Sequence, residues 1–229
     1  MRQDLDRIIL ERGFVRRSGT YFRFICRTVL EVLGFSYEPE LKRKKLSFGL
    51  MSLCAPPDAA AFLQDGFIMQ YDLRCVNRKL YETASAPEEE LSQLESGILP
   101  LLDKAKTPGD AYELMCKLDL ETTGRIDLQD SIKMYLCYDG ALYREALDIA
   151  DSILEDHRNQ LERLAADPKT DAVAYRKARR TDAAALAPLN QLRDCALMKK
   201  EDIIRAVLEQ NYEMNIRLIK KHLKISTDE

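Results

Sequence analysis

The spacing of apolar residues predicts that the chain begins with one short helix and continues into an antiparallel sheet. Residues 3–12 place Leu5, Ile8 and Ile9 on one helical face, and Gly13 suits the C-terminal end of that helix. Aromatic and β-branched residues then dominate segments that we expect to form strands, namely residues 14–17, 20–37, 46–53 and 67–76.

The segment from Thr20 to Tyr37 is longer than one ordinary strand, so we expect two strands with a break near Arg27–Thr28. A polar connection from Glu38 to Lys45 separates this segment from the next strand. We expect these strands to form a sheet of four or five members with the N-terminal helix against one face.

Beyond about residue 85 the apolar spacing changes to the 3.6-residue period of a helix. Pro87 and the three glutamates after it are typical of a helix start. Further helices are predicted at residues 108–118, 127–138, 142–164, 172–187 and 199–223. Pro188 is expected to end the helix that begins at residue 172.

These patterns predict an α+β fold with two parts. Residues 1–80 would form a small antiparallel sheet with one helix, and residues 81–229 a C-terminal helical bundle of about six helices. Residues 134–150 resemble one helix-turn-helix unit of the tetratricopeptide type, with small Ala146 and Ala150 allowing close approach. No second copy follows at a fixed period, so a single antiparallel helix pair explains the segment.

The last predicted helix has two candidate packing faces. One has coiled-coil spacing and would allow a homo-oligomer to form through this C-terminal helix; its members are Ile204, Leu208, Asn211, Asn215, Leu218 and His222. Because half of that seam is polar, we expect instead that the helix packs within its own chain along a second face, formed by Ile203, Val207, Met214 and Leu218.

Composition indicates a cytoplasmic protein. No apolar run approaches the ~20 residues that span a bilayer, and residues 1–12 mix acids and bases without the apolar core of a signal peptide. The six cysteines form no Cys-x-x-Cys pair, and we expect them to be reduced, small apolar residues: Cys26, Cys54, Cys75, Cys116, Cys137 and Cys195.

The net charge of −3 conceals three blocks of different sign. Residues 1–80 have a net charge of +5, residues 81–162 of −12, and residues 163–229 of +4. One interpretation is that oppositely charged parts of the chain face each other. The other is that the acidic helices present a binding surface to a basic protein, which would make this chain a non-enzymatic protein-binding or accessory module.

Asp119 to Asp130 resembles a calcium-binding EF-hand loop in outline. The oxygen-bearing residues at or near the ligand positions are Asp119, Glu121, Thr123, Asp127 and Asp130. The loop ends in an aspartate where a bidentate glutamate is expected, and no second loop pairs with it. An explanation without metal is that Gly124 ends one helix and Asp127 begins the next.

Two basic segments make nucleic acid an alternative partner, through contacts to phosphate. They comprise Lys42, Arg43, Lys44 and Lys45 in the polar connection, and Arg176, Lys177, Arg179 and Arg180 on a predicted helix. The chain as a whole is mildly acidic, whereas nucleic-acid-binding domains are usually basic. A solvated loop and a solvated helix face explain the same residues.

The sequence contains little that points to catalysis. It has only two histidines, and His157 lies on the apolar face of its predicted helix, where a hydrogen-bonded, partly buried imidazole is expected. No phosphate-binding loop, dinucleotide fingerprint or nucleophile elbow is present. We therefore predict no enzyme activity and no cofactor, with an enzyme of unfamiliar site as a further alternative.

Part of the chain resembles a bacterial family of domains of unknown function, family 4304. The similarity lies in Gly13-Phe14 after a short helix, in Tyr21-Phe22-Arg23, and in the strand from Leu46 to Leu50. The segment from Leu136 to Leu147 also fits such proteins. This resemblance implies an α+β fold and assigns no chemistry to any residue.

Overall fold

A five-stranded antiparallel sheet occupies the first part of the molecule, in the order β1-β2-β3-β4-β5. The computed structural model describes residues 2–17, 20–38, 43–56, 71–72, 94–117, 126–167, 169 and 171–223. The strands are β1 (Val15–Arg17), β2 (Thr20–Cys26), β3 (Val29–Glu38), β4 (Arg43–Ser52) and β5 (Tyr71–Asp72). The predicted break at Arg27–Thr28 is confirmed, because these two residues form the turn between β2 and β3.

The connection between β3 and β4 is shorter than expected. Residues 38–45 were predicted to be a polar connection, but the strand pairing continues out to Glu38 opposite Arg43. Glu38 and Arg43 are the last paired positions of the two strands. Three residues of the predicted basic segment, Arg43, Lys44 and Lys45, therefore belong to β4.

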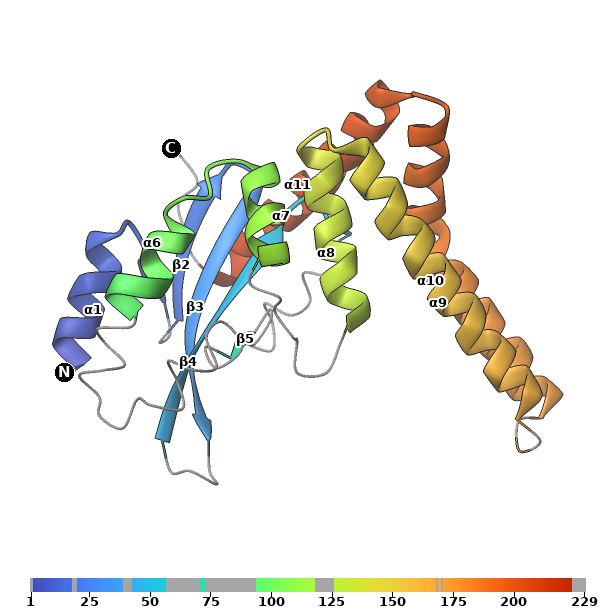
Figure 1. The fold of residues 1–229 in the computed structure, drawn as a ribbon, viewed down its shortest axis with the longest axis horizontal. Coiled ribbons are helices and arrows are strands. Elements are labelled where there is room, and N and C mark those ends of the chain that lie inside the picture. Colours follow the sequence, from blue (N-terminus) through green and yellow to red (C-terminus); the bar gives the residue numbers. More distant parts are fainter. Residues whose placement is uncertain are drawn as a thin grey trace.

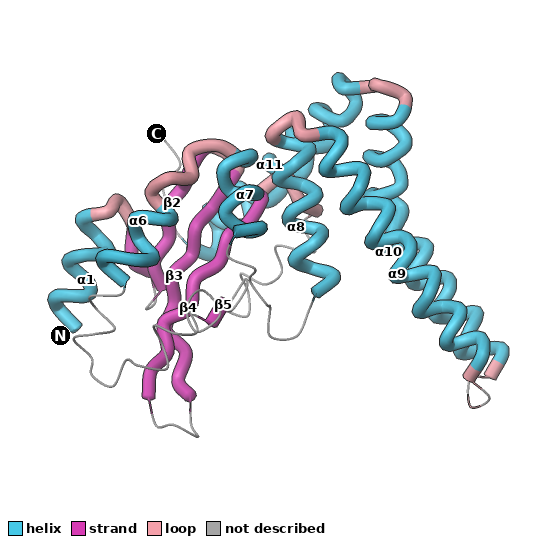
Figure 2. The backbone as a smooth tube through the Cα atoms, in the orientation of Figure 1, coloured by secondary structure: helices cyan, strands magenta, loops and turns pink. Residues whose placement is uncertain are grey.

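Helices make up most of the remaining described chain (Figure 2). They are α1 (Arg2–Glu11), a π-helical turn η2 (Leu94–Ile98), α6 (Leu99–Leu102), α7 (Pro108–Lys117), α8 (Ile126–Asp139), α9 (Tyr143–Ala166), α10 (Ala172–Leu197) and α11 (Glu201–Leu223). The α+β fold with a C-terminal helical part is thus confirmed. The helix start predicted at Pro87 lies outside the described residues.

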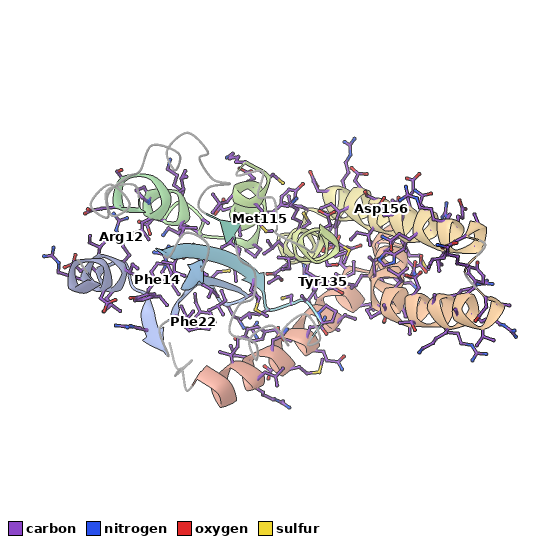
Figure 3. The ribbon with its side chains drawn as sticks, turned by 90° about the horizontal axis from the view of Figure 1, so that it is seen from below. Arg12, Phe14, Phe22, Met115, Tyr135 and Asp156 are labelled. Carbon is purple, nitrogen blue, oxygen red and sulfur yellow. The ribbon has the colours of Figure 1, made fainter. Side chains whose placement is uncertain are left out.

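Helices cover both faces of the sheet (Figures 1 and 3). Helices α1, α6, α7 and α8 lie on one face, where the buried side chains include Ile9, Tyr21, Leu33, Leu50, Leu99, Met115 and Leu136. Helix α11 lies on the other face, against Phe22, Leu30, Val32, Met51 and Leu53, and contributes Ile216 and Ile219. The prediction that the N-terminal helix lies against one face is confirmed, and C-terminal helices, which the sequence did not place, cover the sheet as well.

A third buried cluster joins helices α8, α9, α10 and α11 to the end of β4. It includes Cys54, Tyr135, Tyr138, Ala150, Ile153, Leu192 and Ile204. The predicted domain boundary near residue 80 lies outside the described residues. Side chains from both sides of that boundary share all three clusters.

Helices α8 and α9 form the predicted antiparallel pair, and Ala146 and Ala150 are buried in it. The turn between them depends on Gly140, because a Cβ at this position would lie 3.1 Å from the backbone nitrogen of Gly109. Ala141 ends the turn with φ of +57°, a left-handed conformation that glycine usually fills.

The prediction for the helix beginning at residue 172 was wrong at its C-terminal end. Helix α10 does not stop before Pro188 but continues to Leu197. Leu189, Leu192 and Cys195 are buried beyond the proline, so tertiary packing outweighs the backbone hydrogen bond that proline cannot donate. Pro188 itself is exposed, which leaves room for its ring.

The prediction for the packing face of the last helix was also wrong. Ile203 is 42% exposed, whereas Ile204, Leu208, Asn211 and Asn215 are buried. The face with coiled-coil spacing therefore packs within the same chain. The two asparagines of this face make hydrogen bonds within the chain. Asn211 donates to the carbonyl oxygen of Cys54 (2.9 Å), and Asn215 donates to those of Leu53 (2.8 Å) and Ala55 (2.7 Å).

Candidate functional site

Helices α9 and α10 form a long hairpin that projects from the body of the molecule (Figure 1). We call this hairpin the arm. Its helices have 24 and 26 residues, and Asp171 starts the second by accepting hydrogen bonds from the backbone nitrogens of Val173 (2.8 Å) and Ala174 (2.6 Å). Both are long enough to extend well beyond the body.

Only the part of the arm near the body has a core. Ala146, Ala150 and Ile153 are buried on α9, and Leu189, Leu192 and Cys195 on α10. From Leu154 to Pro188 no described residue is buried. The outer part of the arm thus offers two helices to solvent, and its exposed apolar side chains include Leu164 (40%) and Val173 (69%).

His157 joins the two helices in this outer part. Its Nδ1 lies 2.5 Å from Oδ1 of Asp182, and the two side chains are 21% and 18% exposed. The predicted hydrogen-bonded, partly buried imidazole is confirmed. Its partner on the neighbouring helix fixes the pairing of α9 with α10 at this level, which is a structural role.

Charge is distributed unevenly along the arm. The root, which we define as residues 144–157 and 181–194, carries two arginines and seven acidic residues, a net charge of −5. The tip, residues 158–180, carries seven Lys/Arg and three acidic residues, a net charge of +4. Asp151 pairs with Arg193 across the helices (2.5 Å), whereas Asp148, Glu155 and Asp156 are exposed on α9 (Figure 3 labels Asp156).

The four basic residues predicted on α10 all lie on the tip. Arg176, Lys177, Arg179 and Arg180 are exposed. The structure does not bring them together with Arg43–Lys45, because the β3–β4 hairpin and the arm extend from different sides of the body (Figure 1). Lys42 lies outside the described residues.

The calcium-loop prediction falls largely outside the described residues, which resume at Ile126. Helix α8 begins there, so Asp127 lies within its first turn and does not precede it. Within the parts of the chain that the structure describes, no group of three or more His, Cys, Asp or Glu side chains is arranged to hold a metal ion.

Sequence reasoning missed a buried ion-pair network beneath α1. Glu31 is 1% exposed, and its Oε2 accepts from Nε of Arg23 (2.6 Å). Arg23 also donates to Oδ1 of Asp103 (2.6 Å) and to the carbonyl oxygen of Arg12 (2.9 Å), and its guanidinium stacks over the ring of Phe14. The network ties β2 and β3 to α1 and to the segment after α6.

Burial raises the pKa of Glu31 to about 7, against the attraction of Arg23. Among the described residues, the second carboxylate oxygen, Oε1, has no hydrogen-bond partner. Asp103 behaves differently: burial opposes its ionisation, but hydrogen bonds from Arg23 and Arg12 lower its pKa. The signal in the sequence was a glutamate inside an otherwise apolar strand, between Leu30 and Val32.

A second missed cluster lies under the β2–β3 turn. The carboxylate of Asp139, at the end of α8, accepts hydrogen bonds from Thr28 and Cys54. Burial raises the pKa of Asp139 and that of the Cys54 thiol. A thiol that keeps its proton is a poor nucleophile, so this cluster holds the turn and α8 together without offering reactive sulfur.

The remaining described cysteines are free thiols, as expected. Burial raises the pKa of Cys137 to about 12, which makes it equally unreactive. Cys116 differs from the apolar setting predicted for most cysteines, because it is exposed on α7. No helix in the described part of the chain combines the length and apolar character that crossing a bilayer requires.

Comparison with protein-family models, with curated proteins and with solved structures gives no match to this chain. The resemblance to family 4304 therefore adds no functional residue. The arm is the feature of the described molecule whose surface is least used by its own fold, and it is the candidate functional site.

Proposed function

We propose that this protein is a non-enzymatic protein-binding module whose arm is the binding element. The observation that carries the proposal is the absence of any buried residue among the described positions from Leu154 to Pro188. Packing of an amphipathic face supplies most of the stability of helices in proteins. Two helices that extend so far without a core of their own therefore indicate a surface kept for contact with another molecule.

The acidic root supplies the chemistry of recognition. Asp148, Glu155 and Asp156 are exposed on α9 and unbalanced by the two arginines of the root. Such a surface favours a basic segment of a protein partner, because complementary charge accelerates association and selects against acidic partners. The internal pair of Asp151 with Arg193 neutralises only part of the root.

A capture experiment with the full chain as bait tests this function. We expect the triple variant D148K/E155K/D156K to lose basic partners that the wild type captures at low salt, and we expect moderate salt to release them. The matched control, E95K/E113K/E213K, changes the net charge equally at exposed positions away from the arm and should keep them. Capture that ignores both salt and the root substitutions contradicts the proposal.

Nucleic acid remains a second candidate because the tip exposes Arg176, Lys177, Arg179 and Arg180 together. Gel-shift measurements with the R176E/K177E/R180E variant separate it from protein binding. A shift seen with wild type and lost in the variant supports this candidate, and a shift that is absent or unchanged removes it.

A further inference from the structure

We propose that the basic partner of the root is the tip of a second copy of this chain, so that two arms pair side by side in opposite directions. This inference rests on the proposed function of the arm. Its starting point is that the root and the tip carry nearly equal and opposite net charges, −5 and +4, on one continuous helical hairpin.

The two charges do not cancel within one arm. The centres of the root and the tip on α9 are about 12 residues apart, which corresponds to about 17 Å along a helix. The Debye length at physiological ionic strength is about 8 Å, so attraction between the two ends is largely screened. Among the described residues of the arm, no ion pair joins a side chain of the tip to one of the root, so both keep charged side chains available for contact with another molecule.

The antiparallel arrangement follows from the order of the charges. A two-fold axis across the middle of the arm places each tip against the root of the other copy, and both contacts are then attractive. Parallel pairing would instead place tip against tip and root against root, which repel. An isologous interface of this kind is self-complementary and closes at two copies.

The side chains at the two ends also suit each other in size. The root half of α10 exposes Ala183, Ala184, Ala185 and Ala187, which let another helix approach closely. The tip exposes Leu164 and Val173, whose apolar surface such an approach would cover. The alanines alone do not identify a partner. The second copy is identified by its tip, whose charge is opposite to that of the root.

Sedimentation of the full chain at low and high salt tests the pairing. We expect wild type to be dimeric at about 50 mM salt and to dissociate at about 500 mM, where the Debye length is roughly halved or less. Two variants should be monomeric at low salt, because each gives the root and the tip the same sign: the tip variant R176E/K177E/R180E and the root variant D148K/E155K/D156K.

Mixing the two variants is the decisive step. The acidic tip of the tip variant then faces the basic root of the root variant, and its acidic root faces a basic tip. Both contacts are attractive, so the heterodimer should associate at least about tenfold more tightly than either variant associates with itself. The control R205E/R217E/K220E reverses three exposed charges on α11 and should remain dimeric. Circular dichroism confirms that every variant keeps its helix content.

The outcomes separate this inference from the proposed function. Wild type that stays monomeric at low salt, or a dimer that the tip and root variants do not weaken, overturns the pairing. If wild type is monomeric but captures another basic protein that the root variant does not capture, the arm binds that protein and the pairing is wrong. Binding of the tip to nucleic acid without self-association likewise overturns it.

Discussion

Glu31 is the clearest case of a single residue whose environment changes its chemistry. It lies near the start of β3, 1% exposed, with one oxygen paired to Arg23. The charged groups that act on it come from β2 (Arg23) and from the segment after α6 (Asp103 and Lys106), and Arg12, just after α1, pairs with Asp103. Burial, with repulsion from Asp103, outweighs the attraction of Arg23 and Lys106 and favours the protonated form.

This environment predicts a pH dependence of stability. The folded pKa of Glu31, about 7, exceeds its ordinary value of 4.5, so the folded protein holds a proton that the unfolded chain releases. The stability contributed by that proton is complete below the ordinary pKa and is lost as the pH rises to about 7. We expect this loss to approach about 3 kcal/mol, and we expect Glu31→Gln to remove it.

Urea unfolding from pH 4.5 to pH 8 measures the effect. The difference in slope between wild type and Glu31→Gln is the quantity of interest, because other groups titrate in both proteins. The control Glu209→Gln removes an exposed carboxylate that pairs with Arg27, so it measures how much the loss of a surface ion pair alone lowers the free energy of unfolding. Parallel curves for wild type and Glu31→Gln would show that Glu31 is ionised throughout.

Lys199 carries backbone strain that a substitution can relieve. It has φ of +55° in the turn between α10 and α11, where Lys200 donates to the carbonyl oxygen of Cys195 (2.8 Å). Lys199→Gly should raise the free energy of unfolding by up to about 1 kcal/mol, since a left-handed conformation is costly for residues with a Cβ. Lys200→Gly, next to it without a positive φ, should bring no gain in the same urea titration.

At the scale of elements, most boundaries followed from local pattern, and the exceptions depended on distant residues. Alternation gave the strands around the Arg27–Thr28 turn, and 3.6-residue spacing gave α7, α8 and α9 nearly to the residue. The continuation of α10 past Pro188 depends on side chains buried against other helices. The buried face of α11 depends on three carbonyl groups after β4, which no pattern within the helix can reveal.

The same carbonyl groups make Asn215 the residue on which the docking of α11 most depends. Its side chain donates two hydrogen bonds in a fully buried position, so Asn215→Ala should lower the free energy of unfolding by about 2–3 kcal/mol. Asn190→Ala removes an asparagine that donates to Leu186 on the exposed side of α10, and it should cost less than about 0.5 kcal/mol. Equal losses for the two would contradict this role.

At the scale of the whole molecule, no described residue of the tip belongs to the three buried clusters. Replacing the tip, residues 158–180, by a short Gly-Ser turn removes none of the side chains that the structure shows as buried. We expect the midpoint of thermal unfolding to change by less than about 4 °C, because the three buried clusters stay intact. Backbone amides of the tip should exchange with solvent faster than those around Ala150 in hydrogen-exchange measurements. A large loss of stability would show that the tip supports the body.

The charge arrangement of the arm shows what the sequence alone cannot provide. Counting along the chain placed an acidic block at residues 81–162 and a basic block after it. The hairpin places most acidic residues of the arm near the body and most basic residues around its turn, so the two signs of charge lie at different ends of the arm. The candidate residues on α10 were predictable, whereas their isolation at a solvent-exposed tip required the tertiary structure.

The return of α11 to the sheet has a consequence for how the protein is made. The strands that α11 covers leave the ribosome well before α11, the helix that buries Phe22, Val32 and Met51. The apolar face of the sheet that α11 buries is therefore exposed on the nascent chain until α11 has been synthesised. Ribosome-bound or prematurely terminated chains should thus be natural clients of chaperones, and the finished protein should not.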